Sequence, residues 1–149
     1  MKSQVIVRWP LNVGNKVQFV QYVAGLAVIS ALQEIFTEVC GSSPSPDSFP
    51  IKLKWPNDIY ANTSDGRLLK IGGVLVTAIH QGSQLSASVG LGLNVSNLQP
   101  TTCVHTVLAE MGADTPLPAI QAHASRELIL AVFLDHLEEL LEVHPTIAK

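Results

Sequence analysis

The chain has 149 residues, of which 47% are hydrophobic and 14% are charged, and its formal net charge at pH 7 is −3. This length suffices for one domain, residues 1–149, with a substantial core. Since the sequence lacks the concentrated basic patch typical of nucleic-acid-binding domains, we expect no nucleic-acid partner.

The first predicted element is a helix over Val17–Val39, because apolar residues recur there at helical spacing; they are Val20, Val23, Ala24, Ala27, Ala31 and Ile35. Its apolar start, Val17–Leu32, contains glutamines and a serine and is shorter than the roughly 20 residues of a membrane span. We therefore expect a buried helix and no membrane partner. Gly41 begins a loop that runs through residues 41–48.

The next segment, Ile51–Trp55, alternates apolar residues with lysines, which is the pattern of a half-buried strand. The alternation places Ile51, Leu53 and Trp55 toward the core and the two lysines outward. Pro56 ends the strand, and residues 59–61 are a candidate to resume it. A turn follows over residues 62–67, where Asp65-Gly66 is a strong hairpin signal.

Two further strands are predicted over Leu68–His80 and Leu85–Val95, separated by a turn at residues 81–83. Such short connections indicate antiparallel neighbours. A short helix over Val104–Met111 and a long one over Ala119–Val143 follow. The order predicts an α+β domain, with a largely antiparallel, mixed sheet packed against helices.

Three short motifs fall on these adjacent predicted strands: Lys-Trp-Pro-Asn-Asp at 54–58, Lys-Ile-Gly-Gly at 70–73 and Gly-Leu-Gly-Leu-Asn at 90–94. Strands that follow one another in sequence usually lie side by side. The motifs therefore converge on one patch, which is a plausible floor for an anionic ligand. The residues that we expect to bind this ligand are Asn57, Asp58, Lys70, Gly72, Gly73, Gly90, Gly92 and Asn94.

Each motif also has a purely structural interpretation. Lys70 can neutralise a carboxylate or phosphate beside the glycine gap, or it can be a solvated lysine beside a bulge. Asn94 can contact a sugar or base, or it can cap the end of its strand. Asn57-Asp58 can face a ligand or its metal, or it can be ordinary turn chemistry after a proline.

The remaining reactive side chains suggest no further site. The sequence suggests no catalytic triad of a serine, a histidine and an acidic residue, and neither cysteine lies near a plausible base. Covalent catalysis is therefore not indicated. The histidines show no metal-binding spacing, and the metal ligands stay unknown. Cys40 and Cys103 are far apart, which favours free thiols in a reducing compartment. Residues 1–10 are too short and interrupted for a signal peptide. We expect a cytoplasmic protein.

In this order and spacing, the three motifs resemble the biotin–protein ligase family, and the stretch from Val89 to Cys103 is especially similar to the plant and eukaryotic holocarboxylase synthetases. The similarity runs over roughly Val17 to Phe133. It implies a class II synthetase-like catalytic domain. It also implies a reaction in which biotin and Mg-ATP form biotinyl-5′-adenylate, which a lysine on a biotin carboxyl carrier domain of a carboxylase then attacks.

The resemblance also implies a role for each residue of the motifs. Lys70 corresponds to the family lysine that holds the biotin carboxylate and the adenylate phosphate, and it is the catalytic candidate. Asn57 and Asp58 match positions near the adenylate and its metal. Gly72 and Gly73 let the ligand lie against the backbone. Gly90, Gly92 and Asn94 belong to the strand on the nucleotide side.

Parts of the family pattern have no match in this sequence. They are the glycine- and arginine-rich loop that closes over biotin, the upstream biotin-contacting strand, and the small C-terminal β domain; Arg8-Trp9-Pro10 and Gly14 are poor substitutes for the loop. We therefore expect a truncated catalytic domain. The alternative to an active ligase is an inactive module that binds a nucleotide or a carboxylase, self-associates, or pairs with a full-length ligase.

Overall fold

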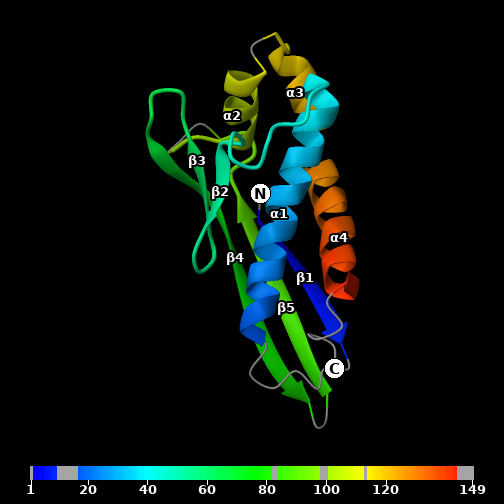
Figure 1. The fold of residues 1–149 in the computed structure, drawn as a ribbon. Coiled ribbons are helices and arrows are strands. Elements are labelled where there is room, and N and C mark those ends of the chain that lie inside the picture. The colour runs from blue at the N-terminus through cyan, green and yellow to red at the C-terminus, as the bar shows by residue number, and fades with distance from the viewer. Residues whose placement is uncertain (1, 10–16, 82–83, 98–100, 113, 144–149) are drawn as a thin grey trace.

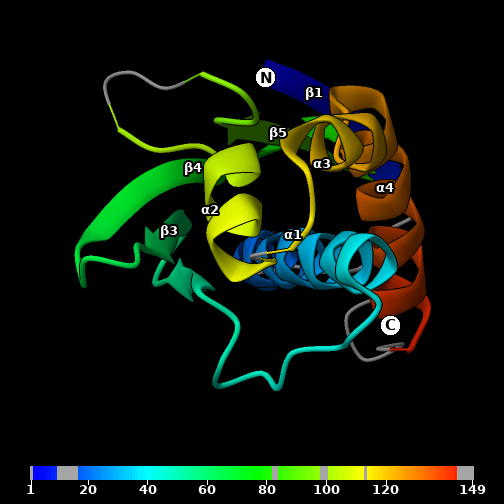
Figure 2. The ribbon, with the colours of Figure 1, turned by 90° about the horizontal axis from the view of Figure 1, so that it is seen from above.

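A computed structural model describes residues 2–9, 17–81, 84–97, 101–112 and 114–143. Its elements in chain order are β1 (Lys2–Trp9), α1 (Val17–Cys40), β2 (Ile51–Lys54), β3 (Asp58–Asn62), β4 (Leu68–Gln81), β5 (Gln84–Leu93), α2 (Val104–Met111), α3 (Leu117–His123) and α4 (Arg126–Val143). Helices α1 and α4 lie side by side along one face of the sheet, and α2 and α3 sit at one end of the molecule (Figures 1 and 2). The predicted α+β class is confirmed.

The described strands form one five-stranded sheet in the order β1-β5-β4-β3-β2, and every pairing in it is antiparallel. Three short connections link β2 to β5 in sequence; the turn signals predicted the second and third of them, but not the one between β2 and β3. In the first of the predicted turns Gly66 has φ +80°, a left-handed conformation that glycine adopts without steric cost. β1 was not predicted as a strand, although its Val5-Ile6-Val7 run has high strand propensity.

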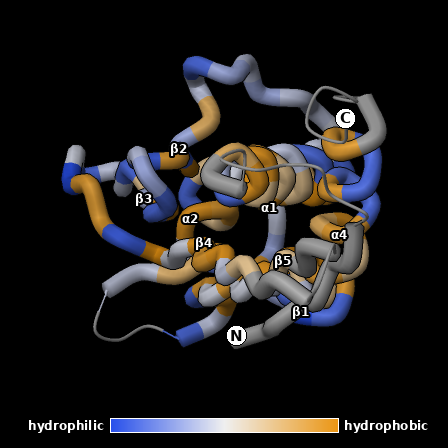
Figure 3. The backbone as a smooth tube through the Cα atoms, turned by 90° about the horizontal axis from the view of Figure 1, so that it is seen from below, coloured by the Kyte–Doolittle hydropathy of each residue, from blue (hydrophilic) through white to orange (hydrophobic). Residues whose placement is uncertain are grey.

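The core lies between the sheet and the layer formed by α1 and α4. All six α1 residues that helical spacing placed inward are buried, and α1 contacts both β4 and α4. Figure 3 shows hydrophobic residues concentrated on these elements, whereas much of the loop after α1 is hydrophilic. By length and composition, Phe19–Cys40 is apolar enough to cross a membrane, but half of its apolar window is buried inside the protein. This burial is typical of a core helix.

Two predictions about β2 and its continuation are wrong. Trp55 is 72% exposed instead of buried, because β2 ends at Lys54 and residues 55–57 form the turn of a hairpin. For the same reason β3 does not resume β2; it folds back and pairs with it, Lys54 opposite Asp58. Leu53 is the last β2 residue that packs inward, where it lies against Gly25 of α1.

The predicted single helix over Ala119–Val143 is also wrong, because it is divided into α3 and α4 at Ala124 and Ser125. Ser125 Oγ accepts a hydrogen bond from the backbone N–H of Leu128 at 3.2 Å, which satisfies a free donor of the first turn of α4. His105 Nε2, on α2, donates to the Ala124 carbonyl at 2.9 Å. Two side chains therefore hold the break: Ser125, just before α4, and His105 on α2.

Candidate functional site

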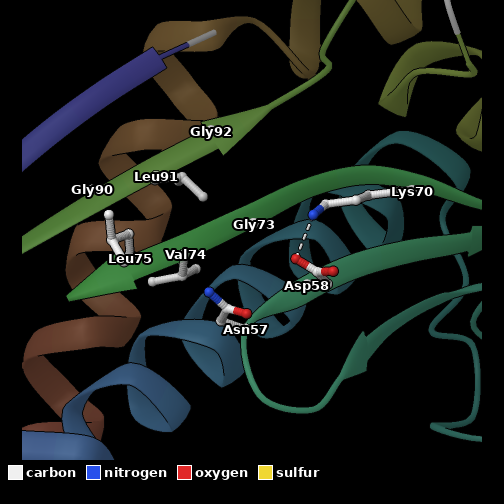
Figure 4. A pocket seen from close by; sticks show the side chains of 9 residues that line it. All are labelled: Asn57, Asp58, Lys70, Gly73, Val74, Leu75, Gly90, Leu91 and Gly92. Carbon is white, nitrogen blue, oxygen red and sulfur yellow. Dashed lines mark ion pairs between the residues drawn. The ribbon is translucent and has the colours of Figure 1, made fainter.

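A pocket of about 450 Å³ opens on the face of the sheet that is turned away from α1 and α4 (Figure 4). Alternation along two neighbouring strands defines this face. Val74 and Leu91 are paired across β4 and β5 and buried in the core, so the pairs on either side of them point outward. The residues that line the pocket are Asn57, Asp58, Lys70, Gly73, Val74, Leu75, Gly90, Leu91 and Gly92.

A β-bulge in β4 brings Lys70 and Gly73 to the same face. Residues three positions apart on a regular strand point to opposite faces. Here Tyr60 pairs with Lys70 while Ile59 pairs with Gly72, so the register shifts by one residue. An additional residue in one strand re-aims the side chains that follow it. The lysine consequently points to the outer face, beside the glycines.

Lys70 Nζ forms an ion pair of 2.5 Å with Asp58 Oδ1 across the mouth of this pocket (Figure 4). The Lys70 side chain is 50% exposed and the Asp58 side chain is 30% exposed. Ion pairs this accessible to water contribute roughly 0–1 kcal/mol. Exchange of the Asp58 carboxylate for an incoming anion therefore costs little, and the lysine charge is available to a ligand.

Asn57 and Asp58 are placed at the pocket by the hairpin that the sequence missed. The backbone carbonyl of Asn57 accepts a hydrogen bond from Val74 N at 2.9 Å, and Asp58 lies opposite Gly73 in the register of β3 and β4. The turn is thus fixed to the strand that carries Lys70. This contact brings the first and second motifs together, as predicted.

The glycines of the second and third motifs divide into two kinds. A Cβ atom built on Gly90 or Gly92 would meet its nearest described neighbour at 3.5 or 3.9 Å, which is ordinary contact. Nothing in the described fold therefore demands glycine at these two positions, although glycine weakens a strand. Gly92 lies opposite Gly73 across β4 and β5. The three glycines leave the backbone bare at the floor of the pocket, which suits the close approach of a ligand.

Gly72 has a packing role instead and does not line the pocket. Its Cβ atom would lie 2.5 Å from the Gly92 carbonyl oxygen and 2.9 Å from Leu93 Cδ1. Both distances are shorter than the contacts that a Cβ atom makes with its neighbours in folded proteins. This glycine lets β4 and β5 pair closely, and its contacts are with protein atoms.

Asn94 also lies outside the residues that line the pocket. Its side-chain Nδ2 donates to Thr101 Oγ1 at 3.2 Å, and its backbone N–H donates to the Ile71 carbonyl at 2.7 Å. Asn94 also accepts a bond from Val104 N at the start of α2. These contacts are those of a residue at the end of its strand, which is the purely structural interpretation of Asn94 given above.

Sequence reasoning missed two elements of the site. Leu75 is 64% exposed and stands in the pocket opposite Gly90. Strand alternation counted from Gly73, two residues earlier, would have placed it there. β1 pairs with the other edge of β5, with Lys2 opposite Gly92 and Gln4 opposite Gly90. The glycines of β5 are therefore flanked by a strand on both sides.

Within the described residues, no group of three histidine, cysteine, aspartate or glutamate side chains could hold a metal ion. Asp58 is the carboxylate that lines the pocket, and it pairs with Lys70. Among the described residues, the lining offers one cation, one carboxylate and bare backbone. Its chemistry is that of a site for an anionic ligand.

A protein-family model, the biotin/lipoate A/B protein ligase family, matches residues 5–94, which include all three motifs. The chain belongs to this family. It is 38% identical over 130 residues to biotin–protein ligase 1, chloroplastic, of Arabidopsis thaliana, a match over 87% of this chain and 31% of that protein. It is 34% identical over 110 residues to the human biotin–protein ligase, over 72% of this chain and 14% of that protein.

The fold is also that of solved biotin protein ligases. The enzyme from Leishmania major in complex with biotinyl-5-AMP matches with a TM-score of 0.58 and 23% identity, over 99% of this chain and 60% of that one. A Helicobacter pylori biotin acetyl coenzyme A carboxylase synthetase with bound biotinylated ATP matches with a TM-score of 0.55 and 23% identity, over 97% of this chain and 55% of that one. The chain spans about a third of the Arabidopsis relative's length.

Proposed function

We propose that this chain carries the adenylate-binding part of a biotin–protein ligase catalytic domain and activates biotin with ATP. The observation that carries the proposal is the meeting of three separate motifs in one pocket, where Lys70 and Asp58 stand over the bare backbone of Gly73, Gly90 and Gly92. Membership of the family supports it. Two neighbours in fold were solved with biotinyl-5-AMP and with biotinylated ATP.

In the proposed first step, a carboxylate oxygen of biotin attacks the α-phosphorus of ATP. The new bond joins that oxygen to phosphorus, the bond to the β-phosphate oxygen breaks, and pyrophosphate leaves. Two anions must approach each other in this step. The charge of Lys70 offsets their repulsion and stabilises the charge that develops on the oxygens. Its accessible pair with Asp58 keeps the ammonium group at the pocket until a ligand anion replaces the carboxylate.

In the proposed second step, the neutral amine of an acceptor lysine attacks the acyl carbon of biotinyl-5′-adenylate. An amide forms, AMP leaves, and the amine loses a proton. The acceptor that we propose is the biotin carboxyl carrier domain of a carboxylase. The pocket supports this step because it lies on the face of the sheet turned away from α1 and α4, which none of the described helices covers, so that a carrier domain has access.

We propose that Mg²⁺ enters with ATP as part of the substrate. Magnesium commonly combines one or two carboxylates with substrate phosphates. Asp58 is the carboxylate in the pocket and can serve as such a ligand once Lys70 turns to the substrate. Asn57, the last residue of the turn before Asp58, is the proposed polar contact of the adenylate.

Pyrophosphate exchange tests the proposed activity. Biotin-dependent exchange of labelled pyrophosphate into ATP is expected for the intact chain, and Lys70→Ala should lower it by at least a hundredfold, in line with the loss of a group that stabilises transition-state charge. The matched control is Lys52→Ala, since Lys52 is another strand lysine whose Nζ donates to the loop carbonyls of Pro46 and Asp47. Equal activity in the Lys70 and Lys52 variants would contradict the role of Lys70.

The second candidate function is an inactive module that binds a nucleotide or a partner. It is favoured by the lining of the pocket, where Lys70 and Asp58 beside bare glycine backbone suit an anion such as a nucleotide phosphate. Calorimetric titration separates the two candidates. A ligase requires biotin binding that Mg-ATP strengthens, whereas a nucleotide module binds ATP alone. A pairing module self-associates or co-purifies with a complete ligase.

We propose the cytoplasm as the location, because Cys40 and Cys103 are both free, as is usual in a reducing compartment. The plastid is the alternative, since one relative is named chloroplastic. Imaging of the complete gene product fused to a fluorescent protein decides between them.

A further inference from the structure

The bulge that aims Lys70 is held from outside the sheet ladder. A bulge leaves part of the backbone without its regular partner across the strands. In β4 the Lys70 carbonyl accepts a hydrogen bond from Thr101 Oγ1 at 3.1 Å, and the next carbonyl, of Ile71, accepts one from Asn94 N at 2.7 Å. Both donors follow the end of β5. The segment after β5 therefore completes the bonding of the two bulge residues.

Thr101 and Asn94 are themselves linked. Asn94 Nδ2 donates to Thr101 Oγ1 at 3.2 Å. A hydroxyl has one donor and two acceptor positions, so Thr101 can accept this bond while it donates to Lys70. The Thr102 carbonyl, at 3.4 Å, is a longer alternative for the same proton. The result is a chain of hydrogen bonds from Asn94 through Thr101 to the Lys70 backbone.

We propose that Thr101 is a positioning residue for Lys70: its hydroxyl fixes the bulge, and the bulge aims the Lys70 side chain into the pocket. The proposal rests on the ligand-binding role of Lys70 in the proposed function. Thr101 does not line the pocket, so it acts only through Lys70 and its strand. The proposal also gives Asn94, at the end of the third motif, a role as the donor that orients the Thr101 hydroxyl.

A lysine side chain is long, and the direction of its Cα–Cβ bond decides which part of a site its ammonium group reaches. At a regular strand position the ladder fixes that direction, but here the register shifts between Tyr60 and Ile59. Small displacements of a group that positions a substrate lower activity strongly. Loss of the Thr101 hydroxyl should therefore reduce ligand affinity.

The first test needs no ligand. Thr101→Val keeps the shape of the side chain and removes the hydroxyl, whereas Thr101→Ser keeps the hydroxyl. Hydrogen exchange of the Asn94 backbone amide, which bonds Ile71, reports local opening of the bulge. We expect exchange roughly two- to thirteenfold faster in Thr101→Val, the range of one net hydrogen bond, and unchanged in Thr101→Ser. The Ile129 amide of α4, bonded to Ser125, is the internal control.

The second test asks whether Thr101 acts through Lys70. Affinity for biotin in the presence of Mg-ATP should fall roughly two- to thirteenfold in Thr101→Val and recover in Thr101→Ser. In a Lys70→Ala background, titrated to saturation, Thr101→Val should have no further effect. A role in general stability would lower the affinity equally in both backgrounds.

The outcomes separate the two proposals. Unchanged Asn94 exchange in Thr101→Val, or an equal loss of affinity with and without Lys70, would overturn the positioning role. If the unmutated chain binds neither biotin nor Mg-ATP, the proposed function fails. In that case the exchange measurement alone decides whether Thr101 holds the bulge.

Discussion

Replacement of Gly92 by alanine should separate binding from stability. The new Cβ atom would lie 3.9 Å from its nearest described neighbour, the Gly73 carbonyl oxygen, so the fold accepts it. Alanine in a strand interior is more stable than glycine by roughly 0.5–1 kcal/mol. We therefore expect Gly92→Ala to raise the free energy of unfolding by about that amount. In a domain of this size this raises the melting temperature by roughly 1–4 °C.

The same methyl group projects from the floor of the pocket. A ligand that lies against the backbone at Gly92 must move away from it. A single methylene in a binding pocket changes affinity by roughly 10- to 200-fold, and we expect a loss of at least about tenfold for biotin with Mg-ATP. Calorimetric titration and thermal unfolding of the same sample measure the two effects together.

Gly72→Ala is the matched control, on the adjacent strand and with the same added atom. Its Cβ would lie 2.5 Å from the Gly92 carbonyl oxygen, a backbone atom that cannot turn aside. Overpacking of this kind costs roughly 1–3 kcal/mol. The two variants should thus change stability in opposite directions. If Gly92→Ala is as destabilising as Gly72→Ala, or binds ligand normally, the assignment of Gly92 to the ligand is wrong.

Two further predictions concern the core and the break between the helices. Phe133 is fully buried, and Phe133→Ala should lower the free energy of unfolding, measured in urea, by roughly 3–5 kcal/mol. Phe19 is 56% exposed, and Phe19→Ala should lower it by less than about 1 kcal/mol. Similar losses in the two variants would contradict the assigned core. Ser125→Ala removes the acceptor for Leu128 N and should lower the free energy of unfolding by about 1 kcal/mol. Ser125→Asp keeps an acceptor and should retain most of that stability. Equal losses in the two variants would argue against a helix cap at Ser125.

Local patterns predicted the parts of the fold that depend on one segment. Helical spacing identified the buried face of α1, and the Asp65-Gly66 signal identified the turn between β3 and β4. The errors occur where tertiary contacts decide. Apolar spacing continues from α3 into α4, and the break is held partly by His105, which lies on another helix. Ser125 was the available signal, because a serine before an acidic first turn is a common helix start.

The site was predictable in composition but not in geometry. The three motifs supplied the residues, but the β4 bulge decides that Lys70 and Gly73 share a face, and pairing with β3 reveals that bulge. The same limit applies to the glycines. Sequence spacing cannot tell that Gly72 is closed by the Gly92 carbonyl while Gly92 is open, since both distances depend on the register of β4 and β5.

The two faces of the sheet contribute differently to stability. The outer face carries two features that weaken a sheet, glycines and a bulge, together with an exposed leucine, Leu75. The inner face carries the packed core against α1 and α4, which supplies the stability that the site lacks. Substitutions that repair the outer face, such as Gly92→Ala, should therefore stabilise the protein at the expense of binding. This opposition is the expected sign of a site kept open for a ligand.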